Sequence, residues 1–475
     1  MRGMKTTPWL AGAALALAVS TAPAQPRTPH DQSAFEIYKE LVEMNTVTTT
    51  GDTAKAADAM AARLLAAGIP ADDVKVFKPA PNKGNVIARY RGTGARKPII
   101  LMAHIDVVEA KREDWTTDPF KLVEKDGFYY GRGTSDDKFM AAAFVANLVR
   151  YHKEGYRPDR DLILILETDE ETGDAEKNGI GWIVKNQRAL IDAEFALNEG
   201  AGVGLDKGKP LRVGVQTAEK VYMDFSLEVR DAGGHSSQPN DHNAIYALAA
   251  GLSKVGAHHF PMVLNETTRL WFQRAADFEE PKIGADMRAI AKPNPDPAAV
   301  KRLSAIPRFN SQMRTTCVAT MLQGGHAPNA LPQLAKANVN CRILPGEPVE
   351  NVEATLKRLA GSGVTVSRVY TANPSQPSPI TPELFGAIER LSAEYWPGAP
   401  IIPSMSAGAT DGAFLRNIGI PTYGHSGLAG EVTENRAHGR DERVQVDSFY
   451  KGVDYLYRLV KMLSSQCGGS SRSGC

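Results

Sequence analysis

The sequence has few cysteines, almost no net charge and no long apolar run in its interior. Only four of its 475 residues are cysteine, and none stands in the C-x-x-C spacing of a zinc or redox site. The formal net charge is +1 and the basic residues form no stripe, which argues against a nucleic-acid partner. Past the N-terminus, no apolar run approaches the ~20 residues of a membrane span. The composition is that of a soluble globular protein, too long for one core.

The first 24 residues predict a secretory signal peptide. Arg2 and Lys5 precede an apolar stretch over 9–19, and residues 22–24 (APA) supply a small-x-small cleavage site. The alternative, an uncleaved membrane anchor, is disfavoured because the apolar stretch is too short to cross a bilayer. We expect an exported protein, periplasmic or secreted, with no membrane attachment after cleavage.

Export permits disulfides, and the four cysteines allow several pairings. Cys317 and Cys341 lie in two strand-like runs joined by a Gly-rich turn, so they could pair across strands. Cys467 and Cys475 flank the Gly/Ser-rich tail over 466–475, which we expect to be flexible, and they could close a loop there. Sequence alone does not fix the connectivity.

Residues 98–108, PIILMAHIDVV, are the stretch around which the chain is organised. An apolar run without alternation predicts a strand buried on both faces, as in a parallel sheet. His104 and Asp106 follow it, and chemistry in open α/β sheets sits just past the carboxyl ends of such strands. A carboxylate beside an imidazole can orient it as a metal ligand. For this pair alone, a buried His–Asp pair without function is the alternative.

Strand-like and helical patterns alternate in the first half of the chain. Runs over 162–166 and 195–197 join the central strand, with helical patterns over 139–151 and 179–187 between them. This alternation predicts an α/β fold, a mostly parallel sheet with helices on both faces.

The pattern changes near residue 211 to alternating strands and helices typical of an inserted α+β domain. Proline clusters after residue 373 mark its end. We therefore divide the mature chain into a first part over 25–216, an insertion over 217–375 and a second part over 376–465.

Metal-capable side chains follow the predicted buried strands. They are His104, the pair Asp136-Asp137, the pair Glu170-Glu171, Glu199 and, late in the chain, His438. If these converge, several carboxylates crowd one crevice, and like charges so close do not all ionise without compensation. A pair of divalent cations supplies that compensation.

Seven motifs in this order resemble the M20 metallopeptidase family, which includes glutamate carboxypeptidase, aminoacylase-1, the yeast vacuolar carboxypeptidase and dipeptidases. They are His-x-Asp, Gly-Arg-Gly-x-x-Asp-Asp, Glu-Glu, Asn-Glu-Gly, Gly-Gly-His-Ser-Ser, an Asn-x-Arg-like segment and His-Gly-Arg-Asp-Glu. The resemblance covers nearly all of the mature chain. It implies a zinc-exopeptidase-like catalytic domain, formed by 25–216 and 376–465, and an inserted lid and dimerisation domain over 217–375.

The resemblance also implies a set of metal ligands for two zinc ions per subunit, with cobalt or manganese as substitutes. His104 and Glu199 would bind one ion, Glu171 and His438 the other, and Asp136 would bridge both. Metal ions of this kind lower the pKa of a bridging water and polarise the scissile carbonyl.

The remaining roles implied by the resemblance concern proton transfer and the transition state. Asp106 would orient His104, and Glu170 would act as general base. His235, in Gly-Gly-His-Ser-Ser, would reach across the interface of a homodimer to stabilise the tetrahedral intermediate. Taken alone, His235 is equally well read as a solvated loop histidine.

Arg342, Asn329 and Gly408 match substrate-binding positions of the family. Arg342 would hold a free α-carboxylate bidentately. The chain departs from common versions at Ala413, where some relatives carry a polar or basic residue, and in extra length around 257–312, which could be a hinge, a pocket wall or dimer surface.

The predicted function is therefore a di-zinc carboxypeptidase or dipeptidase, whose partner is a peptide substrate. An N-acyl-amino-acid amidohydrolase is the alternative, because it shares every catalytic residue named. A non-catalytic binding protein is disfavoured because Glu170 is present with all five ligands.

Overall fold

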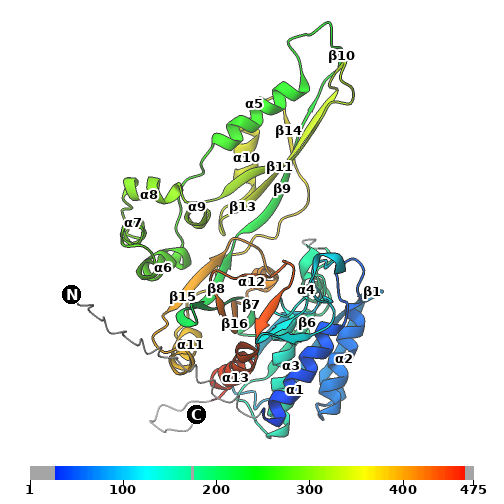
Figure 1. Ribbon diagram of the computed structural model, residues 1–475, viewed down its shortest axis with the longest axis vertical. Helices are drawn as coiled ribbons and strands as arrows, with labels where there is room; N and C mark the ends of the chain where they lie inside the picture. The colour runs from blue at the N-terminus through cyan, green and yellow to red at the C-terminus, as the bar shows by residue number, and fades with distance from the viewer. Residues whose placement is uncertain (1–26, 173–175, 466–475) are drawn as a thin grey trace, which may run out of the picture.

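An eight-stranded sheet forms the larger part of the molecule (Figure 1). The computed structural model describes residues 27–172 and 176–465. The strand order is β1-β2-β6-β3-β7-β16-β8-β15, and the central neighbours β6, β3, β7 and β16 run parallel. The predicted α/β fold with a mostly parallel sheet is confirmed. The strands are β1 (Val74–Ala80), β2 (Lys83–Tyr90), β3 (Ile99–His104), β6 (Leu162–Glu167), β7 (Phe195–Asp206), β8 (Lys209–Glu219), β15 (Ile401–Ser406) and β16 (Thr422–Glu431).

Helices cover both faces of this sheet, which explains the unbroken apolar runs of the central strands. In β3, Leu101 belongs to one core cluster and Met102 to the cluster on the opposite face. One face is covered by α1 (Pro29–Glu43), α2 (Thr53–Ala66), α3 (Lys138–Lys153), α11 (Pro382–Tyr395) and α13 (Val446–Leu463). The other face is covered by α4 (Gly179–Asn186) and α12 (Gly412–Asn417).

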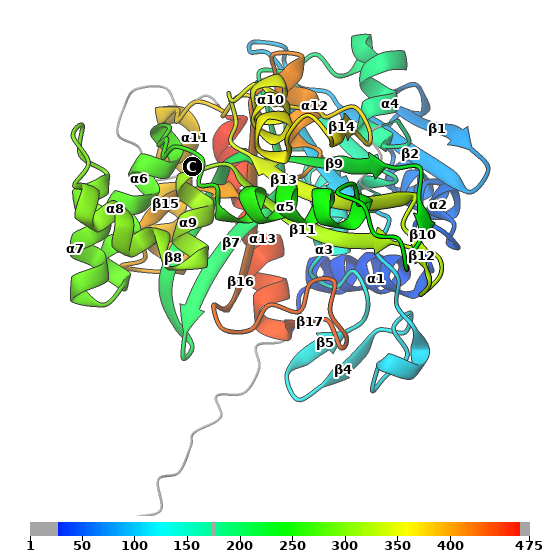
Figure 2. The ribbon, with the colours of Figure 1, turned by 90° about the horizontal axis from the view of Figure 1, so that it is seen from above.

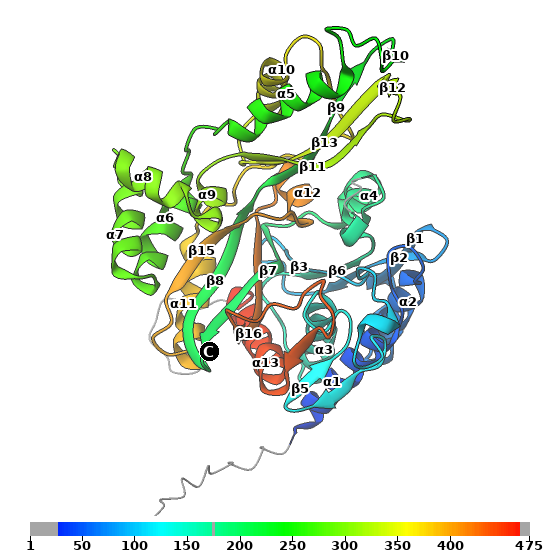
Figure 3. The ribbon, with the colours of Figure 1, turned by 45° about the horizontal axis from the view of Figure 1, so that its top comes forward.

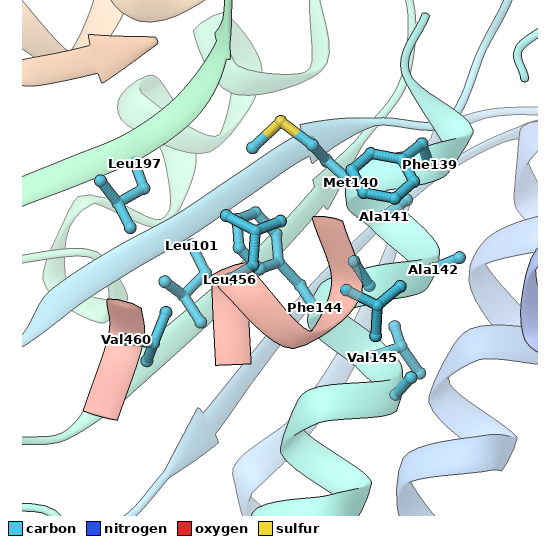
Figure 4. Packing of buried hydrophobic residues seen from close by; sticks show 14 of the residues in the cluster. Leu101, Phe139, Met140, Ala141, Ala142, Phe144, Val145, Leu197, Leu456 and Val460 are labelled. Carbon is cyan, nitrogen blue, oxygen red and sulfur yellow. The ribbon is translucent and has the colours of Figure 1, made fainter. Parts of the chain in front are cut away.

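The helix α3 is buried on nearly all sides. It packs against α1, α13 and β3, so an apolar stripe on one face alone does not describe it. Figure 4 shows Phe144 of α3 close to Leu101 and to Leu456 of α13. This burial fixes the N-terminus of α3, and with it Asp136, at one edge of the sheet.

Two strands of this sheet were missed from the sequence, and one was predicted too short. The strand β15 contains Pro403 and β16 contains Gly424, Gly427 and Gly430, residues that disfavour strands. The strand β7 does not end at 197 as expected but continues to Asp206 and turns into β8. The physical reason is that alternate glycines in β7 remove the side-chain alternation on which a strand prediction rests.

A second, antiparallel sheet, which we call the small sheet to distinguish it from the eight-stranded large sheet, lies above the first in Figure 1, within the predicted insertion. Its order is β11-β13-β9-β14, and α5 and α10 pack against it around a separate core cluster. The elements are β9 (Val221–Arg230), β11 (Thr316–Gly324), β13 (Leu334–Ile343), β14 (Thr365–Arg368), α5 (Ala244–Ala257) and α10 (Val349–Ala360).

Cys317 and Cys341 are directly opposite each other on β11 and β13 and form a disulfide. One of the pairings left open by the sequence is thereby confirmed. Cys467 and Cys475, the tail over 466–475 and the predicted signal peptide lie outside the described residues.

The extra segment around 257–312 folds as four short helices that the sequence reading missed. They pack against β15 of the large sheet, with Ile402 of β15 in their core, and lie on the opposite side of the molecule from β1 (Figure 2). Proline at the start of three of them was a usable signal. They are α6 (Glu266–Ala275), α7 (Pro281–Ile290), α8 (Pro297–Ser304) and α9 (Pro307–Met313).

Two short pieces complete the architecture. A three-stranded sheet is formed by β4 (Val123–Lys125), β5 (Phe128–Tyr130) and β17 (Arg443–Gln445), and a two-stranded ribbon by β10 (Gly234–His235) and β12 (Ala330–Leu331). Among the described residues, no helix is both long and apolar enough to cross a membrane.

Candidate metal centre

The carboxyl ends of β3 and β6 and a position within β7 gather most of the predicted metal-binding side chains on one side of the large sheet. His104 is the last residue of β3, and Glu199 lies within β7. Glu170 and Glu171 open a 3-10 turn just past β6. Asp136 comes directly before the N-terminus of the buried helix α3. Parallel strands bring these positions together, although they are distant in the sequence.

Asp136 lies between two histidines. Its Oδ1 is 3.0 Å from Nε2 of His104, and its Oδ2 is 3.2 Å from Nε2 of His438. The same nitrogen of His438 is 2.9 Å from Oε1 of Glu171, and that of His104 is 3.8 Å from Oε2 of Glu199. One carboxylate thus contacts both histidines, and each histidine has a second carboxylate of its own.

Asp106 contacts His104 in a different way from that expected from the sequence. Its carboxylate accepts hydrogen bonds from the backbone N–H groups of Glu170 and Glu171, at 3.2 and 3.1 Å. Its backbone carbonyl, rather than the carboxylate, lies 3.1 Å from Nδ1 of His104, while the carboxylate is 3.7 Å away. Asp106 therefore holds the His104 ring through its main chain and the Glu170-Glu171 turn through its side chain, because the turn follows the neighbouring strand.

The cluster carries more negative charge than its own cations compensate. Burial and the charge of Asp136 raise the pKa of Glu199 to about 8, in spite of the opposing effect of His104. Burial and the charge of Glu199 raise the pKa of Glu170 well above its usual range. Hydrogen bonds to Asp136 and Glu171 raise the pKa of His438 to about 10. Groups so placed retain or gain protons unless another positive charge is present.

The donor atoms fit divalent cations. Ligand atoms of His104, Asp136 and Glu171 all lie within 4.8 Å of one another, and the same holds for His104, Glu170 and Glu199. Imidazole nitrogen with carboxylate oxygen is a donor set that suits zinc. Glu170, predicted as a general base, is thus as near to the cluster as a ligand would be.

Glu442 is a site residue to which the sequence reading gave no role, although it closes the motif that contains His438. Its side chain is fully buried and accepts hydrogen bonds from the backbone N–H groups of Gly133, Ser135 and Asp136. It also forms a 2.8 Å ion pair with Arg132. Glu442 therefore ties the loop of His438 to the turn that presents Asp136.

Arg342 and Gly408 lie beside the cluster. Both line a cavity of about 360 Å³, together with Glu170, Glu171 and His438. The guanidinium of Arg342 stacks over the ring of Tyr222 at 4.4 Å and donates to the backbone oxygen of Ala407. Ala413, the departure from the family pattern, lines the same cavity.

His235 and Asn329 are not brought to the cluster. The ribbon β10–β12 lies at the far end of the small sheet (Figure 3). His235 is exposed on β10, Asn329 directly precedes β12, and the Ser236 N–H donates to the Asn329 carbonyl. Neither His235 nor Asn329 lines either of two cavities that border the cluster among the described residues. Within one chain, the candidate metal ligands and the predicted transition-state histidine are therefore separate.

Known proteins resemble this chain in sequence and in fold. An N-fatty-acyl-amino acid synthase/hydrolase of Xenopus tropicalis is 29% identical over 375 residues, covering 77% of this chain and 72% of that protein. A probable carboxypeptidase S-like protein of Dictyostelium discoideum is 29% identical over 401 residues, covering 80% and 75%. The crystal structure of an M20 family metallo-carboxypeptidase from Sulfolobus solfataricus superposes with a TM-score of 0.69 at 19% identity, covering 91% and 99%.

A family profile that matches most of the chain identifies the family. The sequence profile of peptidase family M20/M25/M40 matches residues 100–462, a range that contains every residue of the cluster. The predicted resemblance is confirmed, and with it an enzyme of the metallopeptidase and amidohydrolase type. The chain belongs to peptidase family M20/M25/M40.

Proposed function

We propose that the protein hydrolyses the amide bond on the amino side of a C-terminal amino acid whose α-carboxylate is free. The observation that carries this proposal is that Arg342 lines the same cavity as Glu170 and the candidate ligands Glu171 and His438. No carboxylate pairs with Arg342 among the described residues, so its fork of N–H donors is available to an anionic ligand.

Two zinc ions per chain are proposed as the cofactor. His104, Asp136 and Glu199 would hold one ion, and Asp136, Glu171 and His438 the other. Bound there, divalent cations supply Lewis-acid polarisation of the carbonyl and make a water acidic enough to attack near neutral pH. The surplus of carboxylates and their raised pKa values support this assignment.

Glu170 is proposed to transfer the proton between the attacking water and the leaving nitrogen during hydrolysis. It faces the cluster without being needed to complete either His–carboxylate pair. From there it would accept a proton from the attacking water and pass it to the leaving nitrogen. Asp106 would keep Glu170 in place through its bond to the Glu170 N–H.

Peptides are the first candidate substrates, which makes the protein a carboxypeptidase or dipeptidase. N-acyl amino acids are the second candidate, favoured by the name of the Xenopus relative. Both present the same C-terminal half to Arg342. The test is a panel of dipeptides and N-acyl amino acids, each with a free or an amidated C-terminus, assayed with and without a chelator. Equal rates on free and amidated substrates contradict the proposal.

A homodimer is proposed, with each site completed by the partner subunit's His235. The strand β11 is an edge of the small sheet and exposes large apolar side chains, with Val318 at 60%, Met321 at 61% and Leu322 at 69% exposure. Such an edge invites pairing with another chain. The distance of the ribbon β10–β12 from its own cluster supports action in trans (Figure 1).

Mixed dimers test this arrangement. Glu170→Ala and His235→Ala subunits are each expected to be inactive alone, whereas their mixed dimer has one site with both residues intact. With random exchange, activity returns to about a quarter of the wild-type value. A mixture that stays inactive after verified exchange shows that His235 does not act in trans.

Export through residues 1–24 is likewise proposed. The disulfide between Cys317 and Cys341 supports an oxidising compartment, periplasmic or extracellular. Mass spectrometry of the N-terminus of the mature protein tests cleavage after Ala24.

A further inference from the structure

The cavity of Arg342 lies against one face of the small sheet. Arg342 on β13 is directly opposite Tyr222 on β9, whereas their neighbours Met223 and Cys341 belong to the core of the small sheet. Successive side chains of a strand point to opposite faces, so Arg342 and Tyr222 project from the face away from that core. Tyr370 follows β14, the strand on the other side of β9, and lines the same cavity.

The two tyrosine rings stack on each other and are held at their hydroxyl ends. Their centroids are 6.0 Å apart and their planes differ by 15°. The Tyr222 hydroxyl donates a 2.9 Å hydrogen bond to Oδ2 of Asp224, and the Tyr370 hydroxyl lies 3.5 Å from the same oxygen. Oδ1 of Asp224 accepts hydrogen bonds from the side-chain amides of Asn338 and Asn340. The tyrosine pair therefore offers a ligand ring carbon rather than a hydrogen-bonding group.

Further apolar side chains complete the wall of the cavity. Phe414 and Ala413 belong to α12, which lies below the small sheet in Figure 1. Val221, Ala372 and Ala409 also line the cavity. Because position 413 is alanine, this part of the wall carries no polar side chain.

Most polar side chains that line the cavity outside the cluster are bound within the chain. Glu219 forms a 2.6 Å ion pair with Arg416 and accepts a hydrogen bond from the Thr410 hydroxyl. The ammonium group of Lys220 donates a 2.8 Å hydrogen bond to the carbonyl of Arg314 and is fully buried. Neither charge is thus available to a charged substrate side chain.

Asp411 is the exception on this wall. Its Oδ1 accepts a hydrogen bond from the Asn178 side chain, whereas its Oδ2 is buried without a hydrogen-bond partner among the described residues. Burial raises the pKa of Asp411 well above its usual range, which weakens its attraction for a cation. A basic side chain is therefore the competing ligand for this cavity.

The position of Arg342 determines which part of a substrate meets this wall. With the α-carboxylate on Arg342 and the scissile nitrogen toward Glu171 and His438, the side chain of the same amino acid fills the rest of the cavity. The guanidinium of Arg342 lies 4.4 Å from the centroid of the Tyr222 ring, so a side chain one carbon away from the carboxylate lies beside the tyrosine pair. A volume of about 360 Å³ is in the range of ligand pockets.

We infer that this cavity selects substrates by the side chain of their C-terminal residue, that it takes an aromatic or large aliphatic side chain, and that Tyr370 provides a selective contact. The inference rests on the proposed function, in which Arg342 holds the α-carboxylate. It gives the face of the small sheet a second role beside carboxylate recognition.

The test uses glycyl dipeptides and N-acetyl amino acids that end in alanine, leucine, phenylalanine, glutamate or lysine, assayed with the full-length enzyme and its metals. In the wild type, kcat/KM is about tenfold or more higher for leucine and phenylalanine than for alanine, and lowest for glutamate and lysine. Tyr370→Ala lowers kcat/KM for phenylalanine by about tenfold, mainly through KM, and leaves alanine within about twofold. Tyr370→Phe keeps the ring and the preference.

Val369→Ala is the matched control. Val369 precedes Tyr370 in the chain, is 55% exposed and does not line the cavity, so its loss leaves the preference unchanged. Because Tyr370 also packs against the core of the small sheet, Phe414→Ala provides a second measurement from α12. It is expected to lower the preference for phenylalanine over alanine severalfold. Melting temperatures and bound metal, measured on every variant, separate misfolding from altered specificity.

Three results overturn the inference. They are equal rates for all C-terminal side chains, an equal loss on alanine and phenylalanine substrates in both Tyr370→Ala and Phe414→Ala, and a preference for lysine, which assigns the cavity to Asp411. If no amide with a free C-terminal carboxylate is hydrolysed, the proposed function itself fails. Hydrolysis of such amides without a preference among side chains refutes only the side-chain selection.

Discussion

The two sheets of this molecule place their functional residues in opposite ways. The large sheet brings His104, Glu171 and Glu199 together through buried parallel strands, and His104 is only 2% exposed. The small sheet carries Arg342 at its border with the cluster and His235 at its exposed far end. The candidate metal ligands thus lie in a packed core, whereas substrate recognition depends on how the small sheet is placed relative to them.

Because of this difference, we expect substitutions in the two sheets to have different effects. Changes in the large sheet abolish turnover, metal binding or stability, because their partners are fixed by packing. Changes in the small sheet impair substrate recognition by Arg342 or the contribution of His235, and they leave the candidate metal ligands intact.

Glu170→Gln gives the largest expected effect. Loss of a general base lowers kcat by about 10²- to 10⁴-fold. The bound metal is retained, since His104, Asp136, Glu171, Glu199 and His438 remain. Kinetics with metal analysis on the same sample check this. Loss of a full metal equivalent shows instead that Glu170 is a ligand and that its role has been exchanged with that of a neighbouring glutamate.

Acid is expected to destabilise the large sheet through His425. This residue is fully buried between the Gly214 carbonyl and the Tyr455 hydroxyl, and burial lowers its pKa to about 4. Between pH 6.5 and 4, His425 is protonated in the unfolded chain but not in the folded chain. The free energy of unfolding therefore decreases as the pH is lowered through this range. The loss is on the order of 3 kcal/mol.

Unfolding measured across this pH range tests the assignment. His425→Gln removes the titrating group and flattens this part of the pH dependence, whatever its effect on absolute stability. An unchanged slope in that variant shows that other groups cause the acid sensitivity.

Arg342→Ala tests whether the small sheet recognises the α-carboxylate of the substrate. A hydrogen bond to a charged group contributes about 1.5–3 kcal/mol, so kcat/KM falls by about 10- to 100-fold on substrates with a free α-carboxylate. Amidated substrates are poor for the wild type and change little in the variant. An equal loss on both kinds of substrate removes Arg342 from carboxylate recognition.

Glu442→Gln gives the smallest expected effect, a drop of about tenfold in metal affinity at the site of His438 and Asp136. The amide still fills the space but no longer accepts every N–H of the 133–136 turn. Activity returns with excess metal, which a general structural defect does not allow. Glu434→Gln, in the same loop but paired only with arginines, serves as control.

The large sheet was predictable where its strands are buried on both faces. The runs ending at His104 and Glu167 are continuous apolar segments, and the structure has them as β3 and β6. The strands β15 and β16 were not predictable from propensity, because Pro403 and the glycines of β16 are tolerated only through tertiary context.

Motif order pointed to residues most of which the structure brings together, but it did not predict their hydrogen-bond partners. Nothing in the sequence indicates that the Asp106 carboxylate binds the turn after the neighbouring strand, since this depends on strand order. The role of Glu442 requires the packing of two loops that are distant in sequence. The separation of His235 from the cluster is likewise visible only once the small sheet is placed.

The central claim is that the cluster around Asp136 is a catalytic metal centre. Its most direct test is to strip the protein with a chelator and then titrate zinc while measuring bound metal and hydrolysis together. The account predicts that activity is lost on stripping and returns in step with binding, up to about two ions per chain. Full activity in protein that is free of metal would contradict it.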